Sequence, residues 1–425
     1  MQIAKSFSDP TTVKLIITAT PAELESVKKH VLGHFAGQVK VPGFRAGKAP
    51  LEMLEKSIDP NALSNEFLEH AMNSLYRKAM EHEKLRPVAQ PQVQIKKFVP
   101  FTELEFEVET EVIGNVKLPD YKTIKVAKPP ATVTAKDVDE VLESLRTRSA
   151  RREDIDRPAK LGDEVVIDFT GKNAKGQPIA GGDGKDYPRI LGSEQFVLGF
   201  ERELVGVQAG DKRQFDLTFP ADYGVSTLRG QKTRFEVSVK KVSELAKPKL
   251  DNEFAAQAGP FKTLAELKSD IKKQLKQERQ QAADRNFEND VVRAVTAKAH
   301  VDIPKVMIDE QVMALEEDEK RNLVYRGQTW QEHLAQEGIT EQQHRERHRP
   351  EAEERVKAGL VLSEIAAQER IEVKPNEVAG RIHALKAQYQ DPGMQAELDK
   401  PEARQDIANR LPSEKTIAKL VSYSL

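Results

Sequence analysis

The sequence predicts an α+β protein of several domains: an N-terminal α/β domain, a central antiparallel β-sheet domain with a short helix, and a helical C-terminal domain. The chain has 425 residues, enough for about three domains of average size. Short alternating segments separated by Gly, Asn, Asp and Pro turns lie between residues 161 and 245. From Pro248 onward the apolar residues recur at helical spacing. The expected ranges are 1–112, 113–149 (a linker that returns to the helical body), 150–246 and 247–425.

Charge and composition exclude several classes of protein. The 66 basic and 68 acidic residues leave a net charge of −2, which argues against a protein that coats nucleic acid with its whole surface but is compatible with a local basic patch. Cysteine is absent, so disulfides, Cys-ligated metals and cysteine nucleophiles are excluded. The N-terminus lacks a signal-peptide pattern, and no segment approaches the ~20 apolar residues of a membrane span. We therefore expect a cytoplasmic protein without membrane contact.

The N-terminal domain is predicted from two strands and two helices. Residues 13–20 alternate as a strand, and residues 103–112 alternate with apolar side chains on one face and glutamates on the other. Thr20 is the expected N-cap of the first helix, with Glu23 closing a capping box. The second helix is expected over 63–84, where apolar residues recur at helical spacing.

The sheet domain is much richer in aromatic residues than the helical region. Residues 161–245 hold eight aromatic side chains in 85 positions, whereas residues 248–425 hold seven in 178. The first region can therefore build an aromatic-lined pocket. The helical region carries apolar stripes too thin for one large core. Helix starts are expected at Thr263 in this region and at Thr134 in the linker.

The loop between the first two helices combines turn residues with exposed contact residues. Two prolines and two glycines in residues 41–50, VPGFRAGKAP, fix a turn. An aromatic and a guanidinium group at its tip suit apolar contact and phosphates or carboxylates. A phosphate-binding P-loop is a poorer interpretation, because the glycines stand one residue too close and no Ser or Thr follows the lysine. The candidate binding residues are Gly43, Phe44, Arg45, Gly47 and Lys48.

An ordered set of motifs in the sheet domain resembles FKBP-type peptidyl-prolyl isomerases. The set runs from VIDFTG at residues 166–171 through GQPI at 176–179 and FVLGF at 196–200 to RFEV at 234–237. The resemblance implies a pocket that isomerises X-Pro bonds, with Phe200 as its floor and the Tyr223 hydroxyl bonding a substrate carbonyl. Phe200 stands where many relatives carry tryptophan, and Ala180 where many carry aspartate. The pocket residues that it implies are Phe169, Ile179, Tyr187, Phe196, Val197, Phe200, Tyr223 and Phe235, whereas Phe215 and Phe219 are expected to fill the core.

The whole chain resembles the trigger factor family. The loop GFR followed by GK and P is similar to the family's ribosome-docking signature, and the order of docking domain, isomerase and helical body is the family's order. The resemblance implies a chaperone that docks near the ribosomal exit tunnel, on ribosomal protein and RNA, and shields nascent and unfolded chains. It also implies a homodimer away from the ribosome and no cofactor. A free-standing prolyl isomerase and an assembly factor for folded complexes are the alternatives.

Two other patterns contain residues typical of metal or dinucleotide sites but lack the rest of the motif. His30 with His34, and His344 with His348, have the i,i+4 spacing of helical metal ligands. Neither pair stands in a His-Glu-x-x-His motif and no third ligand is evident, so we expect solvated histidines and no metal. The Gly-Gly-Asp-Gly cluster at 181–184 is interpreted as a flexible connection between strands rather than a dinucleotide loop.

Overall fold

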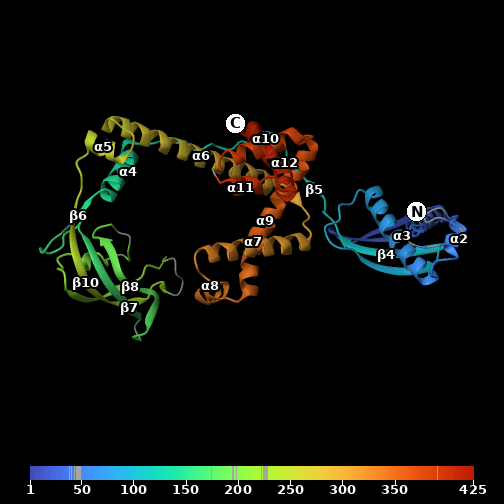
Figure 1. Ribbon diagram of the computed structural model, residues 1–425, viewed down its shortest axis with the longest axis horizontal. Coiled ribbons are helices and arrows are strands. Elements are labelled where there is room, and N and C mark those ends of the chain that lie inside the picture. Colours follow the sequence, from blue (N-terminus) through green and yellow to red (C-terminus); the bar gives the residue numbers. More distant parts are fainter. Residues whose placement is uncertain are drawn as a thin grey trace. The chain divides into compact units, whose positions relative to one another are not determined.

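The computed structural model describes the chain apart from residues 38, 40, 43, 45–48, 174, 194, 195, 198, 222, 224–227 and 390, and the side chain of Ala180. The described residues form two compact units, whose elements are labelled in Figure 1. One unit comprises Met1–Val126, Glu288–Asn322 and Gln342–Leu425, and the other Ala127–Phe287 and Leu323–Glu341. Among the described residues, no helix combines the length and apolar character needed to cross a membrane.

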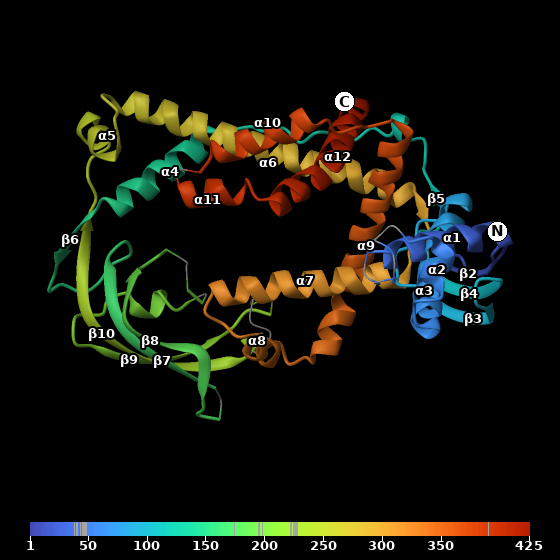
Figure 2. The ribbon, with the colours of Figure 1, turned by 45° about the vertical axis from the view of Figure 1, so that its right-hand side comes forward.

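The N-terminal region is an antiparallel sheet covered on one face by two helices (Figure 2). The sheet order is β1 (Gln2–Asp9), β2 (Thr12–Thr18), β4 (Glu103–Glu111) and β3 (Gln92–Val99). The covering helices are α1 (Pro21–Phe35) and α3 (Pro60–His82). Both predicted strands and both predicted helices are confirmed. The edge strands β1 and β3 were not predicted, because their side chains are mostly exposed and show no alternation of buried and exposed positions.

Local capping explains where these helices begin. The Glu23 carboxylate accepts hydrogen bonds from the Thr20 backbone N–H (2.9 Å) and hydroxyl (2.7 Å), which holds the first turn of α1. The Asp59 carboxylate accepts from the Ala62 N–H at 2.9 Å. With this N-cap and Pro60 at the first helical position, α3 starts three residues before the predicted Leu63.

The linker is attached to the C-terminal helices of its own unit. Strand β5 (Val116–Lys117) pairs antiparallel with β11 (His300–Val301). In the 3₁₀ helix η1 (Tyr121–Thr123), the Tyr121 hydroxyl donates to Glu369 Oε1 at 2.8 Å. Farther along, the linker helix α4 (Ala135–Arg148) begins at Thr134, as predicted, and lies in the other unit.

The central region is a five-stranded antiparallel sheet in the order β6-β10-β7-β8. The fifth strand, β9, pairs with residues 232–238 of β10. Its strands are β6 (Arg151–Asp154), β7 (Glu164–Asn173), β8 (Pro178–Ile190), β9 (Lys212–Thr218) and β10 (Lys232–Ala246). The predicted short helix is the 3₁₀ turn η2 (Arg202–Leu204). The inner faces of these strands bury one apolar core, which contains most of the aromatic residues of the region.

Helices dominate the chain after residue 248, as predicted. They are α5 (Asn252–Ala258), α6 (Leu264–Lys298), α7 (Lys305–Tyr325), α8 (Trp330–Glu337), α9 (Glu341–Gln368), α10 (Pro375–Lys386), α11 (Pro392–Glu397) and α12 (Pro401–Ser424). The Thr263 hydroxyl accepts from the Glu266 N–H at 3.2 Å, which confirms the helix start expected there.

Helices α7 and α9 contact each other through charged side chains. The buried Glu316 carboxylate, only 4% exposed, accepts from Arg345 Nε at 2.6 Å and from Lys320 Nζ at 2.6 Å. On the same pair of helices, His344 Nε2 lies 2.9 Å from Glu319 Oε2. The expectation of solvated histidines without a third ligand is therefore wrong for His344, because packing of two helices distant in sequence buries it beside a carboxylate.

Candidate functional site

An aromatic pocket of about 470 Å³ opens on the inner side of the central sheet. Its walls come from β7, β8 and β10 and from the segments that join them. The residues that line it are Phe169, Ile179, Gly181, Gly182, Asp183, Tyr187, Arg189, Phe196, Val197, Phe219, Tyr223, Leu228 and Phe235. The structure thus brings seven of the eight residues expected in the pocket into one cavity.

The eighth residue, Phe200, lies in the core against that cavity. Its ring is fully buried, with its centroid 4.2 Å from that of Phe196 and 5.2 Å from that of Phe235. Phe169 meets Phe196 edge to face, with centroids 5.3 Å apart. Contacts of this kind fix ring orientations, so Phe200 supports rings that line the cavity.

Glycines in β8 make room for side chains of the pocket. A Cβ atom at Gly184 would lie 2.5 Å from the Phe169 ring, and one at Gly182 would lie 2.2 Å from Ile179 Cγ1. The Gly-Gly-Asp-Gly cluster lies inside β8, so its interpretation as a connection between strands is wrong. Close approach of the Phe169 and Ile179 side chains, which the sequence alone does not reveal, requires glycine here.

A bulge in β8 precedes Tyr187 and is held by charged groups. The register shifts between Ile167 and Phe169, and Asp186 adopts a left-handed φ of 49°. The Asp168 carboxylate accepts from the Asp186 N–H at 2.8 Å, and Lys240 Nζ lies 2.9 Å from it. The hydrogen bond from the Asp186 N–H, and to a smaller extent the one from Lys240, lower the pKa of Asp168. The carboxylate that holds the bulge is therefore ionised at neutral pH.

Several lining residues were not expected from the sequence. Phe219, assigned to the core, is buried there and also lines the cavity. The Arg189 guanidinium lies over the Tyr187 ring at 4.4 Å and donates to the Tyr187 hydroxyl. Alternation along β8 places residues 187 and 189 on one face, so this pattern could have indicated Arg189.

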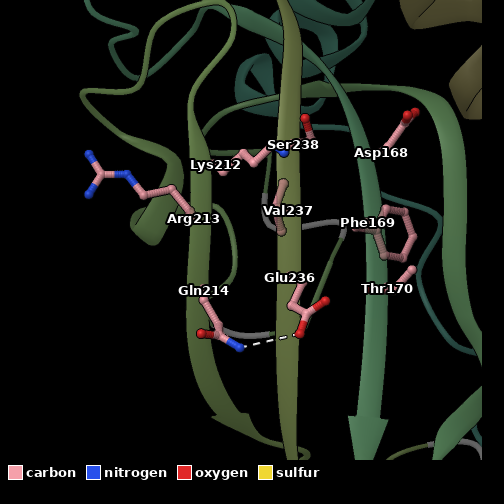
Figure 3. A pocket seen from close by; sticks show the side chains of 9 residues that line it. All are labelled: Asp168, Phe169, Thr170, Lys212, Arg213, Gln214, Glu236, Val237 and Ser238. Atoms are coloured by element: carbon pink, nitrogen blue, oxygen red, sulfur yellow. Dashed lines mark hydrogen bonds between the residues drawn. The ribbon is translucent and has the colours of Figure 1, made fainter.

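A second hollow, of about 440 Å³, lies on β7, β9 and β10 and has a different character (Figure 3). The polar residues that line it include Gln214 and Glu236, which are joined by a 3.3 Å hydrogen bond. Phe169 also contributes to it, but its ring is largely buried in the core. This charged sheet surface lacks the ring of aromatic side chains that a proline would require, so we assign no site to it.

The aromatic pocket has the physical properties needed to isomerise a prolyl bond. The planar amide resists rotation by a barrier of roughly 18–20 kcal/mol because of its resonance. Twisting removes that resonance and makes the amide less polar, so an apolar cavity shaped for the twisted form lowers the barrier. This chemistry requires no nucleophile or metal.

The loop between α1 and α2 (Leu51–Glu55) is anchored at its base. Val41 is buried in a small core with Leu32 and Leu54. Beyond it Phe44 is 42% exposed, although its backbone N–H donates to the Val41 carbonyl at 3.2 Å. An apolar ring held outside the core is available to a partner. The other expected binding residues, Gly43, Arg45, Gly47 and Lys48, lie outside the described residues.

The fold and the pocket define the class of the central region. An antiparallel sheet around an aromatic cavity is the arrangement expected of an FKBP-type prolyl isomerase, and residues 156–242 match the family "FKBP-type peptidyl-prolyl cis-trans isomerase". Residues 1–145 match "Bacterial trigger factor protein (TF)", and residues 263–422 match the C-terminal family of the same protein. The chain belongs to the trigger factor family.

Curated relatives support this over the whole length of the chain. Trigger factor of Pelotomaculum thermopropionicum is 34% identical over 96% of this chain and 94% of its own. That of Carboxydothermus hydrogenoformans is 32% identical over 99% of both chains. A solved structure, described as "Promiscuous Substrate Recognition in Folding and Assembly Activities of the Trigger Factor Chaperone", covers 99% of both chains with 20% identity and a TM-score of 0.45.

Proposed function

We propose that the protein is a chaperone that docks on ribosomes near the polypeptide exit tunnel, binds nascent and unfolded chains and isomerises their X-Pro bonds. The observation that carries the proposal is the combination, in one trigger factor chain, of an aromatic pocket in residues 156–242 with an exposed Phe44 on an anchored loop. Residues 1–112 would dock, 150–246 would isomerise and 247–425 would hold clients, with 113–149 as the linker.

In the isomerase each expected pocket residue has a proposed role. Both tyrosines line the pocket, Tyr187 exposed and Tyr223 half-buried, and the Tyr223 hydroxyl would bond a substrate carbonyl. The remaining expected residues would surround the proline ring and exclude water from the twisting amide. These residues are Phe169, Ile179, Phe196, Val197 and Phe235, with Phe200 holding the rings from the core.

In the docking loop Phe44 would contact a ribosomal protein, while Arg45 and Lys48 would meet phosphates or carboxylates of the ribosome. Gly43 and Gly47 would give the backbone the freedom that the turn requires. Ribosomal RNA and protein are both proposed partners of this loop.

Exposed apolar side chains on the helical body support the binding of unfolded chains. Large side chains on α7, namely Met313, Val324 and Tyr325, are exposed, and Tyr325 almost fully so. Scattered apolar groups among charges provide weak contacts to many sequences without forming one large insoluble patch. We further propose a cytoplasmic protein that forms a homodimer away from the ribosome and uses no cofactor.

Ribosome co-sedimentation tests the proposal against its main alternative, a free-standing prolyl isomerase. Replacing Gly43, Phe44 and Arg45 together by alanine should abolish co-sedimentation and leave peptide isomerase activity unchanged. Arg45→Ala alone should weaken binding and, if its partner is phosphate, reduce the salt dependence of binding. Undiminished binding of a folded triple variant would defeat the docking role and favour the free-standing isomerase.

Deletion of the isomerase tests where the chaperone surface lies. A chain that lacks residues 151–245, with the ends rejoined, should still slow the aggregation of a denatured protein, because the helical body remains. Complete loss of protection in a folded shortened chain would assign client binding to the isomerase region instead.

A further inference from the structure

Three side chains with metal-binding chemistry meet where α7 and α9 contact each other. His344 and His348 are one helical turn apart on α9 and therefore share a face, while Glu319 approaches them from α7. One ligand atom from each of the three residues lies within 4.8 Å of the others. His344 Nε2 is 2.9 Å from Glu319 Oε2, and His348 Nε2 is 3.8 Å from the same oxygen.

The distances among the three ligand atoms are close to those around one bound transition-metal ion. Ligand atoms about 2.0–2.1 Å from a tetrahedral Zn²⁺ ion stand roughly 3.3 Å from one another. The separations of 2.9 Å and 3.8 Å from Glu319 bracket this value, and the centroids of the two imidazole rings are 4.4 Å apart. Only small side-chain rotations would bring the three atoms around one ion.

The environment is partly closed and has a second carboxylate behind one imidazole. His344 is 2% exposed, whereas the side chains of His348 and Glu319 are 28% and 31% exposed, which leaves one side open to water or a further ligand. The Nδ1 atom of His348 lies 3.6 Å from Glu351 Oε2. A carboxylate behind a ligating imidazole orients the ring and raises its basicity.

Beside the cluster, two basic groups contact a different, buried carboxylate. Arg345 Nε and Lys320 Nζ each lie 2.6 Å from oxygens of the buried Glu316. The pair of Arg345 with Glu316 thus joins α9 to α7 beside the three candidate ligands.

We infer that Glu319, His344 and His348 form a binding site for a divalent transition metal of the Zn²⁺ type, which fastens α7 to α9. Two imidazoles and one carboxylate are a known zinc ligand set, with water completing the coordination. Imidazole nitrogen disfavours Mg²⁺ and Ca²⁺, which prefer oxygen ligands. The site is independent of the prolyl pocket and of the docking loop.

Titration of the full-length chain without a histidine tag tests this inference. Zn²⁺ in competition with a chromophoric chelator should reveal one tight equivalent per chain, and Zn²⁺ should raise the Tm. His348→Ala and Glu319→Gln should each weaken binding by roughly 100-fold or more, while Glu351→Gln, which removes the supporting carboxylate, should weaken it by about 10-fold. Both ligand variants concern partly exposed side chains, so folding is expected to survive.

A second cluster of histidines around a glutamate, in the same chain, provides the matched control. His34 Nδ1 and His70 Nε2 lie 3.7 Å and 3.4 Å from Glu66 Oε1, but their side chains are 57% and 41% exposed. The double variant His34→Ala, His70→Ala should bind Zn²⁺ as the parent chain does. Loss of the tight equivalent in this variant, its persistence in His348→Ala and Glu319→Gln, or its absence from the parent chain would each overturn the inference.

Discussion

The core of the isomerase and the contact between α7 and α9 are stabilised by different kinds of interaction. In the first, Phe169, Phe200 and Phe235 are buried with ring centroids no more than 6.0 Å from a neighbouring ring. In the second, a buried Glu316 and a buried His344 each contact a charged partner on the facing helix. One region is held by apolar packing and the other by specific polar pairs.

This difference matches what each region is proposed to do. A pocket for one small ring requires fixed walls, and close packing of aromatic side chains provides them. A surface for many unfolded chains requires apolar side chains left exposed, so the helices beneath it have fewer apolar residues to bury. Polar pairs then define how the helices meet, although each pair adds little net stability.

The largest expected effect is in the aromatic core. Phe200→Ala should lower the free energy of unfolding of the isomerase region by about 3–5 kcal/mol, because it leaves a cavity that the surrounding rings cannot fill. Denaturant unfolding followed by near-ultraviolet circular dichroism measures this. Suppression of aggregation by the full chain at low temperature should change little. A loss below about 1 kcal/mol would mean that the core is loosely packed.

A smaller effect is expected at the polar contact. Arg345→Ala should destabilise the helical body by about 1–3 kcal/mol, because it removes a hydrogen-bond donor from the buried Glu316 carboxylate. The matched control is Arg355→Ala, which breaks an exposed pair with Glu351 and should cost about 0.5 kcal/mol or less. Equal losses in the two variants, measured by chemical denaturation, would show that burial of the pair is unimportant.

The two regions should also differ in their response to apolar substitution. Glu316→Met removes the buried carboxylate and leaves Arg345 and Lys320, whose side chains are 47% and 30% exposed, to be solvated by water. We expect this variant to be at least as stable as Arg345→Ala in the same denaturation experiment. The reverse order would show that the polar contact contributes net stability.

Within the pocket, Tyr223→Phe should separate catalysis from packing. Loss of one hydrogen bond worth about 0.5–1.5 kcal/mol should slow isomerisation of an X-Pro peptide by about 2–12-fold and leave the unfolding midpoint unchanged. Tyr389→Phe, outside the isomerase, serves as the control. An unchanged rate would remove the hydroxyl from the proposed mechanism.

The smallest effect is expected where the linker meets the helical body. Hydrogen bonds from Lys122 and then Tyr121 lower the pKa of Glu369 from 4.5 to about 2. A depressed pKa contributes stability that is complete above pH 4.5 and is lost as the pH falls toward 2. Glu369→Gln should therefore reduce the loss of stability over this pH window, whereas Glu353→Gln, an exposed control, should not. Superimposable pH profiles of parent and Glu369→Gln chains would contradict this prediction.

Local pattern was sufficient for much of the fold. Alternation in 103–112 predicts β4 and its buried face, because the strand has one face in the core and one in water. Thr20 and Thr134 mark the starts of α1 and α4, since capping depends on residues three positions apart. The order of motifs from residue 166 to residue 237 was enough to indicate the isomerase and its pocket residues.

Contacts between distant residues required the tertiary structure. Glu319 is 25 residues from His344, so only the packing of α7 on α9 reveals the third candidate ligand. Gly184 is required by the Phe169 ring, 15 positions away in sequence. The sequence by itself determined which segments are helix, strand and turn, because those preferences act over a few neighbouring residues. Tertiary structure decided which side chains share a cavity or a charge, because burial and electrostatics depend on distance in space.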